Sequence, residues 1–374
     1  MGLYLKLKKH FPDFSIDVEL TADKEFLVLF GPSGAGKSLI LKMISGILRP
    51  DEGVISIDGD VIFDSWNNID APMRDRRIGF VFQEYSLFPH MTVFKNISYG
   101  IKDPGGPDAG VLVRELIGLM RLNGLEQRFP HEISGGQRQR VALARTLAAN
   151  PRLILLDEPF SALDNMVREK LRADLTNIHR RFPITTMMVT HDLEEAFMMG
   201  SRISVVNNGR IEQTGSREDV FYRPVTRNVA RFLGARNIFT GCIASVDGAE
   251  AVIESAGFTA LKATVPAHTM LRAGQEVSFC IRPEDIQVVR PDKPLTKEKA
   301  SDNILDAEVS TIVGMGGTHI IYLDISSGAA GRKDLLGVPA LKVEAPNFVV
   351  KKLALVPGSA LRVLLKKESI WIIP

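Results

Sequence analysis

A glycine-rich segment near the N-terminus has the residue types and the spacing that bind phosphate. It fits the pattern G-x-x-x-x-G-K-[ST], between a predicted strand and a predicted helix. Glycines let backbone N–H groups curl around phosphate oxygens, Lys37 can bridge the β- and γ-phosphates, and the Ser38 hydroxyl can bind Mg²⁺. The predicted phosphate-binding residues are Gly31, Pro32, Ser33, Gly34, Ala35, Gly36, Lys37 and Ser38.

Two carboxylates end an apolar run later in the chain. Asp157 and Glu158 follow Leu153–Leu156 directly. Asp157 can complete the Mg²⁺ shell, and Glu158 can accept a proton from the attacking water or orient it. A pair of acidic residues at a strand end is usually a surface feature, but together with the phosphate-binding segment it predicts a catalytic centre.

Two further polar residues end apolar runs in the same way. His191 follows Met187–Thr190, and Gln83 follows Ile78–Phe82. In parallel α/β sheets, ligands collect at the carboxyl ends of the strands. We therefore predict that His191 senses the γ-phosphate and that Gln83 contacts Mg²⁺ or the water.

The segment Ile133–Gln137 opens another helix with small residues, which leaves its first N–H groups available to an anion. One phosphate chain does not need two such cradles. We therefore predict that this one closes over a nucleotide bound to a second copy of the chain.

Alternating apolar runs and helical patterns must position these residues. The expected strands are Phe26–Phe30, Ile78–Phe82, Leu153–Leu156 and Thr186–Val189. The expected helices are Ser38–Leu48, Gln137–Ala149, Asn165–Arg181 and Leu193–Met199. This alternation predicts an α/β core with a mostly parallel sheet covered on both faces, and a helical subdomain at about 84–147 inserted between two strands.

The pattern changes after residue 235, where strand-like runs separated by Gly, Pro and Asp predict an all-β domain over 236–374. Within it, Asn237-Ile238 matches Asn303-Ile304, and the segment from Gly274 matches the segment from Gly358. We therefore expect a duplicated, OB-like domain with halves at about 236–290 and 302–374.

The composition agrees with folded domains. The chain has 374 residues, 45% of them hydrophobic and 24% charged, with a net charge of +2. This composition excludes a disordered chain, and no apolar run reaches the ~18 residues of a membrane span. Two cysteines, Cys242 and Cys280, form no disulfide framework or metal-ligand spacing, so we expect both to pack in the β domain.

Taken together, these motifs resemble the ATPase subunit of ATP-binding-cassette (ABC) transporters over residues 1 to 235. The resemblance rests on the phosphate loop, Gln83, ISGGQ at 133–137, LILLDEP at 153–159, SALD at 161–164 and His191. It implies a P-loop ATPase that hydrolyses ATP with Mg²⁺ held by Ser38, Gln83 and Asp157. The catalytic residues it implies are Glu158, His191 and Gln83.

The resemblance also implies a homodimer with two sandwiched nucleotides. The residues that would contact the ATP of the other copy are Ser134, Gly135, Gly136, Gln137 and Asp164. Phe11 is the candidate for stacking on adenine, with Phe14 as its competitor. The region around Tyr85–Tyr99 would receive the coupling helix of a membrane permease.

The β domain resembles the regulatory (TOBE) domain of importer ATPases, in particular at Ile281–Ile286. Gly234–Asn237 and Leu365–Ile370 resemble parts of molybdate-binding β domains, although Gly234 replaces a serine. Arginine, lysine and backbone N–H groups suit a tetrahedral oxyanion. The candidate oxyanion residues are Ala235, Arg236, Asn237, Lys366 and Lys367.

The sequence therefore predicts the motor of a molybdate or tungstate import system. Importers of sulfate, ferric iron, polyamines or sugars are the alternatives, followed by an ABC ATPase that acts on nucleic acid or ribosomes. The expected location is peripheral, on the cytoplasmic face of the inner membrane. The expected partners are permease subunits and, indirectly, an extracytoplasmic substrate-binding protein, with no nucleic acid.

Overall fold

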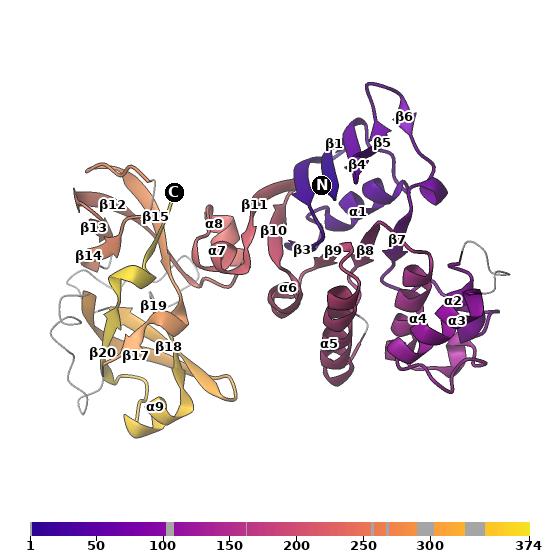
Figure 1. Ribbon diagram of the computed structural model, residues 1–374. Coiled ribbons are helices and arrows are strands. Elements are labelled where there is room, and N and C mark those ends of the chain that lie inside the picture. Colours follow the sequence, from indigo (N-terminus) through magenta and orange to yellow (C-terminus); the bar gives the residue numbers. More distant parts are fainter. Residues whose placement is uncertain are drawn as a thin grey trace. The chain divides into compact units, whose positions relative to one another are not determined.

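The computed structural model describes residues 2–101, 108–161, 163–255, 258–266, 269–289, 303–325 and 341–374. The chain divides into two compact units, Met1–Val220 and Phe221–Pro374. Figure 1 shows the helices and strands of each unit.

The first unit is built on a sheet of eleven strands in the order β6-β5-β4-β1-β2-β11-β10-β3-β9-β8-β7. The strands are β1 (Leu3–Phe11), β2 (Phe14–Ala22), β3 (Phe26–Phe30), β4 (Glu52–Ile57), β5 (Asp60–Asp64), β6 (Ile69–Asp70), β7 (Ile78–Val81), β8 (Leu153–Asp157), β9 (Thr185–Thr190), β10 (Arg202–Asn207) and β11 (Arg210–Ser216). The five from β10 to β7 pair in parallel. Every residue of β3, β8 and β9 is buried, as a sheet covered on both faces requires.

The helices of this unit are α1 (Lys37–Ser45), α2 (Val93–Ser98), α3 (Ala109–Leu119), α4 (Gly135–Ala148), α5 (Asn165–Arg181) and α6 (Leu193–Met199). Residues of α1 share a buried apolar cluster with Leu27 and Leu29 of β3. Val28 points to the opposite face, near the end of α6. The segment between β7 and β8 carries α2, α3 and α4, which form a helical group in Figure 1. The predicted P-loop α/β core with a helical insertion is confirmed.

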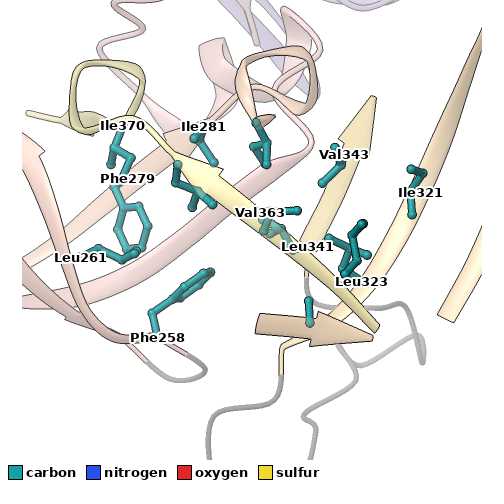
Figure 2. Packing of buried hydrophobic residues seen from close by; sticks show 14 of the residues in the cluster. Phe258, Leu261, Phe279, Ile281, Ile321, Leu323, Leu341, Val343, Val363 and Ile370 are labelled. Atoms are coloured by element: carbon teal, nitrogen blue, oxygen red, sulfur yellow. The ribbon is translucent and has the colours of Figure 1, made fainter. Parts of the chain in front are cut away.

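The second unit is β-rich and contains two five-stranded sheets, ordered β14-β13-β12-β15-β21 and β16-β20-β17-β18-β19. The strands are β12 (Asn237–Asp247), β13 (Glu250–Ser255), β14 (Phe258–Thr264), β15 (Glu276–Ile281), β16 (Gln287–Val288), β17 (Asn303–Gly314), β18 (Thr318–Ile325), β19 (Leu341–Pro346), β20 (Ala360–Leu365) and β21 (Trp371–Ile373), with helix α9 at Asn347–Lys352. Both sheets contribute to one apolar core (Figure 2). Within it, Phe258, Leu261 and Phe279 of the first sheet lie with Leu323 and Val363 of the second.

The two halves of this unit repeat the same backbone details. β12 has a register shift after Ile243, and β17 has one after Val309. The carbonyl of Ile243 accepts from the N–H of Gly274 at 2.8 Å, and the carbonyl of Val309 accepts from the N–H of Gly358 at 2.7 Å. Ile243 and Val309 have the same separation in the sequence as Asn237 and Asn303, and Gly274 and Gly358 begin the other pair of matching segments. The backbone therefore supports a duplication.

The halves also exchange their last strands. β16 follows β15 in the chain but pairs with β20 of the other sheet, and β21 follows β20 but pairs with β15. Each sheet is therefore completed by a strand from the other half of the sequence.

Two equivalent asparagines clamp the halves together. The amide of Asn237 on β12 exchanges two hydrogen bonds of 2.8 Å with the backbone of Lys342 on β19. The amide of Asn303 on β17 makes the matching pair of bonds with the backbone of Lys262 on β14, at 2.7 and 2.9 Å. Both asparagines are buried. Each amide therefore makes the hydrogen bonds that water would otherwise make with the backbone of an edge strand of the opposite sheet, β19 or β14.

We expect Asn303→Ala to destabilise the second unit by about 1–3 kcal/mol, because it leaves the backbone of Lys262 without its buried partners. Urea unfolding of the full chain, followed by the fluorescence of Trp371 in a Trp66→Phe background, measures this change. The control is Asp306→Ala on the same strand, whose carboxylate is exposed and whose loss should cost no more than about 0.5 kcal/mol. If the urea midpoint of Asn303→Ala equalled that of the control, the hydrogen bonds of Asn303 would not stabilise this unit.

The division between the units lies earlier than the expected position after residue 235. Helix α7 spans Arg217–Tyr222, and α8 (Arg227–Phe232) contributes Ala230 to a small buried cluster with Cys280 and Ile373 of the β-rich unit. Arg282 donates to the carbonyl of Leu233 at 3.1 Å, which fixes the segment after α8. Residues 221–235 therefore fold with the second unit, because their apolar side chains pack on its strands.

Only one of the two cysteines is buried. Burial raises the pKa of the Cys280 thiol to about 11, whereas Cys242 is exposed because it alternates with the buried Ile243 along β12. The expectation that both cysteines pack in the domain is wrong for Cys242. Within the part of the chain that is described, no helix is long and apolar enough to cross a membrane.

Candidate functional site

The phosphate-binding segment links β3 to α1 with backbone shapes that glycine permits. Gly34 and Gly36 have φ of +82° and +95°, which side chains rarely adopt. Gly36 also lies against the ring of Phe14, and a side chain at Gly31 would collide with the carbonyl of Val206. Backbone conformation and close packing therefore both explain the glycines of this loop. The loop ends at the first N–H groups of α1.

Lys37 lies buried inside the loop. Its ammonium group donates to the carbonyl oxygens of Gly31 at 2.7 Å and Pro32 at 2.8 Å. Burial lowers the pKa of Lys37, while the nearby carboxylates of Glu158 and Asp157 oppose that shift. The structure thus brings the lysine and both predicted carboxylates into one electrostatic environment.

Ser38 and Asp157 meet in the structure. The Ser38 hydroxyl donates to Oδ1 of Asp157 at 2.6 Å, which joins the first turn of α1 to the end of β8. Burial raises the pKa of Asp157, and the bond from Ser38 opposes that shift. Adjacent hydroxyl and carboxylate oxygens are the hard ligands that Mg²⁺ prefers, so this donor set fits the metal.

Glu158 and His191 form the next contact along this edge of the sheet. Oε1 of Glu158 lies 3.3 Å from Nδ1 of His191. Glu158 has φ of +44°, an unfavourable value for a glutamate, and its N–H donates to the carbonyl of Val189 on β9 at 3.1 Å. This strained backbone directly after β8 accompanies a Glu158 carboxylate that lies beside His191 at the end of β9, where it can activate a water.

Gln83 is exposed two residues after β7. The loop that follows it contains two residues with positive φ, Tyr85 and Ser86. Arg145 of α4 donates to both of their carbonyls, at 3.1 and 3.0 Å. Arg145 therefore holds the loop after Gln83 against α4, the helix that begins next to Ser134.

The segment that we predict as a second anion cradle lies at the start of α4. The Ser134 hydroxyl accepts from the N–H of Gln137, and Oε1 of Gln137 accepts from the N–H of Ser134. A Cβ at Gly136 would lie 2.6 Å from the side chain of Val167 on α5. Glycine at this position lets α4 pack closely against α5 and leaves Ser134 exposed.

Asp164 caps α5 at the same place. Its Oδ1 accepts from the N–H of Val167 at 3.0 Å, and the carboxylate is exposed. A Cβ at Gly135 would lie 3.2 Å from the side chain of Leu163, so the Ser134 and Asp164 segments adjoin each other. The predicted contacts to a second copy therefore share one surface.

The aromatic candidates lie at the hairpin between β1 and β2. The rings of Phe11 and Phe14 are 6.1 Å apart, and both are partly buried against the apolar cluster of the first unit. Phe14 is the ring that packs on Gly36. Phe11 stays the residue that we predict for adenine.

Two of the five candidate oxyanion residues of the β-rich unit have other partners in the structure. Asn237 uses its amide to bind the backbone of Lys342, and Lys367 contacts Glu250 at 2.9 Å. Ala235 is buried, Arg236 is exposed, and Lys366 is half-buried. The long-range partners of Asn237 and Lys367 could not be found from the local motifs.

A small cavity of about 180 Å³ lies in the second unit beside Ala235. It is lined by Arg282 and Ser369 but also by the carboxylates of Asp285 and Glu368. Burial raises the pKa of Asp285. Two carboxylates in the lining oppose the binding of an anion.

Sequence reasoning missed two sets of residues around the predicted centre. One is Arg145, which holds the loop after Gln83. The other is a buried polar group below His191, formed by Thr190, Arg172 and Glu195. An arginine or glutamate within a helix has no local signal that distinguishes it from a solvated residue, so only tertiary packing reveals these roles.

This chain is similar to ATP-binding proteins of known transport systems. A family model described as "ABC transporter" matches residues 15–161. The spermidine/putrescine import ATP-binding protein of Rubrobacter xylanophilus is 39% identical over 325 residues, which are 86% of this chain and 82% of that protein. The sulfate/thiosulfate import ATP-binding protein of Nitrosomonas europaea is 36% identical over 377 residues, which are 98% of this chain and 96% of that protein.

Among solved structures, a bacterial ABC transporter cassette is 32% identical and superposes with a TM-score of 0.49, covering 57% of this chain and 98% of the cassette. The match to the Nitrosomonas europaea protein extends over both units, so similarity is not confined to the nucleotide-binding half.

Proposed function

Because the chain belongs to the ABC transporter family, as the ATPase subunit of an import system, we propose that it hydrolyses ATP at the edge where β3, β8 and β9 end. The observation that carries this assignment is that two pairs of side chains are in contact at this edge of the sheet. Ser38 bonds to Asp157, and Glu158 lies 3.3 Å from His191, both beside the buried Lys37.

Each side chain has a distinct task in this proposal. Lys37 and the N-terminal N–H groups of α1 neutralise the phosphate chain. Glu158 holds the attacking water and accepts its proton, and His191 contacts the γ-phosphate. Ser38, Asp157 and Gln83 would hold Mg²⁺, which supplies positive charge to the β- and γ-phosphate oxygens when bound.

We propose that a second copy completes each site. Ser134 and Asp164 are exposed and Gln137 is half-buried beside them at the start of α4, and this shared surface suits the triphosphate of a partner chain. Phe88 and Tyr99 pack 4.5 Å apart next to the loop after Gln83, and Tyr99 is 62% exposed. This aromatic surface is our proposed contact for a membrane permease, which would place the chain on the cytoplasmic face of the membrane.

We propose a tetrahedral oxyanion as the imported substrate. Sulfate is supported by a relative of matching length, whereas molybdate or tungstate is supported only by the sequence of Gly234–Asn237, in which Asn237 binds Lys342. A polyamine is the second candidate, because the Rubrobacter xylanophilus protein, named for spermidine/putrescine import, is similar over 86% of this chain. The permease and the substrate-binding protein would determine which solute enters.

Uptake measurements test both proposals. The chain would be copurified with its permease, reconstituted in liposomes and supplied in turn with labelled molybdate, tungstate, sulfate and spermidine. We expect ATP-dependent accumulation of an oxyanion, and none with Lys37→Met as the matched control. Spermidine uptake alone would contradict the oxyanion, whereas accumulation without ATP would contradict the motor itself.

A further inference from the structure

The turn that carries His191 rests on buried charged and hydroxyl side chains. Thr190 of β9 and Arg172 of α5 are each 2% exposed, and Glu195 of α6 is 4% exposed. Arg172 is among the largest fully buried side chains of the described chain. Burying charges of this kind is costly and adds little to stability compared with apolar packing, so their presence beside a reactive residue needs another explanation.

The hydrogen bonds of this group fix the backbone on both sides of His191. The Thr190 hydroxyl donates to Oε2 of Glu195 at 2.6 Å and accepts from the N–H of Asp192 at 3.0 Å. The N–H of Glu195 in turn donates to Oδ1 of Asp192 at 3.1 Å. The residues before and after His191 are therefore held by α6, which fixes the backbone position from which the imidazole reaches Glu158.

Arg172 connects this turn to α5. Its Nη2 lies 3.3 Å from Oε1 of Glu195 and 3.5 Å from Oδ2 of Asp192. One turn earlier on the same helix, Arg168 contacts Oδ2 of Asp192 at 3.4 Å and donates to the carbonyl of Leu163 at 3.3 Å. Helix α5, which Asp164 caps, is thus bonded both to the loop before it and to the turn that carries His191.

We propose that Thr190, Glu195 and Arg172 are positioning residues that hold His191 against Glu158 and tie its position to the Asp164 loop. The proposal rests on the catalytic role proposed above for Glu158 and His191. A shift of the imidazole would leave the contacts of the phosphate loop itself unchanged, because the described hydrogen bonds of Lys37 and Ser38 involve no residue of this group. It would slow hydrolysis, since a displacement of ~1 Å can reduce a rate by ~10²-fold.

Thr190→Val provides the sharpest test, because valine keeps the shape and β-branching of threonine and removes only the hydroxyl. We expect kcat of the full chain to fall about tenfold, as for other supporting contacts, with KM for ATP within about twofold of wild type. Thr190→Ser restores the hydroxyl and should recover kcat to within about twofold of wild type. A kcat near wild type for Thr190→Val, or equal losses in both variants, would overturn the proposal.

Two adjacent carboxylates of α6 provide a matched pair. Glu195→Gln removes the buried charge that faces Arg172 and should lower kcat about tenfold. Glu194→Gln changes a carboxylate that is 68% exposed, although it also lies 3.3 Å from Arg172, and should leave kcat unchanged. Equal kcat values for the two variants would contradict the role of the buried carboxylate.

A double variant tests whether Thr190 affects the rate by positioning His191. In a His191→Ala background, Thr190→Val should reduce the residual rate less than twofold, because coupled residues are not additive. The full tenfold loss in that background would overturn the proposal. Wild-type turnover in Glu158→Gln would instead contradict the proposed function, so the two failures are distinguishable.

Discussion

Replacing Glu158 with glutamine is expected to reduce ATP hydrolysis by about 10²–10⁴-fold and to leave ATP binding intact. The amide keeps the size of the carboxylate but cannot accept the proton of the attacking water. Lys37, Ser38 and Asp157 keep their contacts, since none of their hydrogen bonds involves the side chain of Glu158. Phosphate release and calorimetric ATP titration of the full chain measure the two quantities separately.

The same variant should accumulate an ATP-bound dimer. Light scattering is expected to show twice the 41.2 kDa mass in the presence of ATP, and Ser134→Arg in this background should abolish that increase by obstructing the proposed composite site. Glu169→Gln, an exposed carboxylate of α5, is the control and should hydrolyse ATP at the wild-type rate. Rapid hydrolysis by Glu158→Gln would show that another group is the base.

Replacing Lys37 with methionine is expected to weaken ATP binding about 30-fold or more. Loss of one partner of a buried, charged hydrogen bond costs about 2–5 kcal/mol, and each 1.4 kcal/mol is a tenfold change in affinity. Methionine has similar length, so the change removes the charge that would meet the β- and γ-phosphates without opening a large cavity. Calorimetry with Mg²⁺ and ATP measures the dissociation constant.

Lys6→Met provides the comparison for this second result. Lys6 lies on β1 of the same unit, but its side chain is 50% exposed and pairs with Glu19 at 2.9 Å on the surface. We expect ATP affinity to stay at the wild-type level there. If Lys37→Met bound ATP as tightly as Lys6→Met, the phosphate loop would not be the nucleotide site.

The α/β core could be predicted well because its strands are continuous apolar runs. Phe26–Phe30 and Asn165–Arg181 occur with the expected bounds, whereas β9 is longer than Thr186–Val189 because Thr185 and Thr190 are polar but buried. Helix α1 ends at Ser45 rather than Leu48, since Gly46 adopts φ of +86°. Local composition cannot reveal that a threonine hydroxyl has a buried partner.

The candidate site shows the same limit. Asp157, Glu158 and His191 could be placed together because they end or follow parallel strands of one sheet, and Ser38 because it opens the helix after another of these strands. The amide of Asn237 could not be assigned, because its partner Lys342 is 105 residues away on another sheet. The motif that resembles an oxyanion site therefore contains a residue with a structural task.

The exchange of β16 and β21 also bears on how the β-rich unit arose. A single ancestral half would have left β15 or β20 without its last neighbour, so it would have needed a second molecule to supply that strand. Fusion of two such genes would convert a strand-swapped pair of molecules into one polypeptide. Asn237 and Asn303 would then be relics of an interface that once joined separate chains.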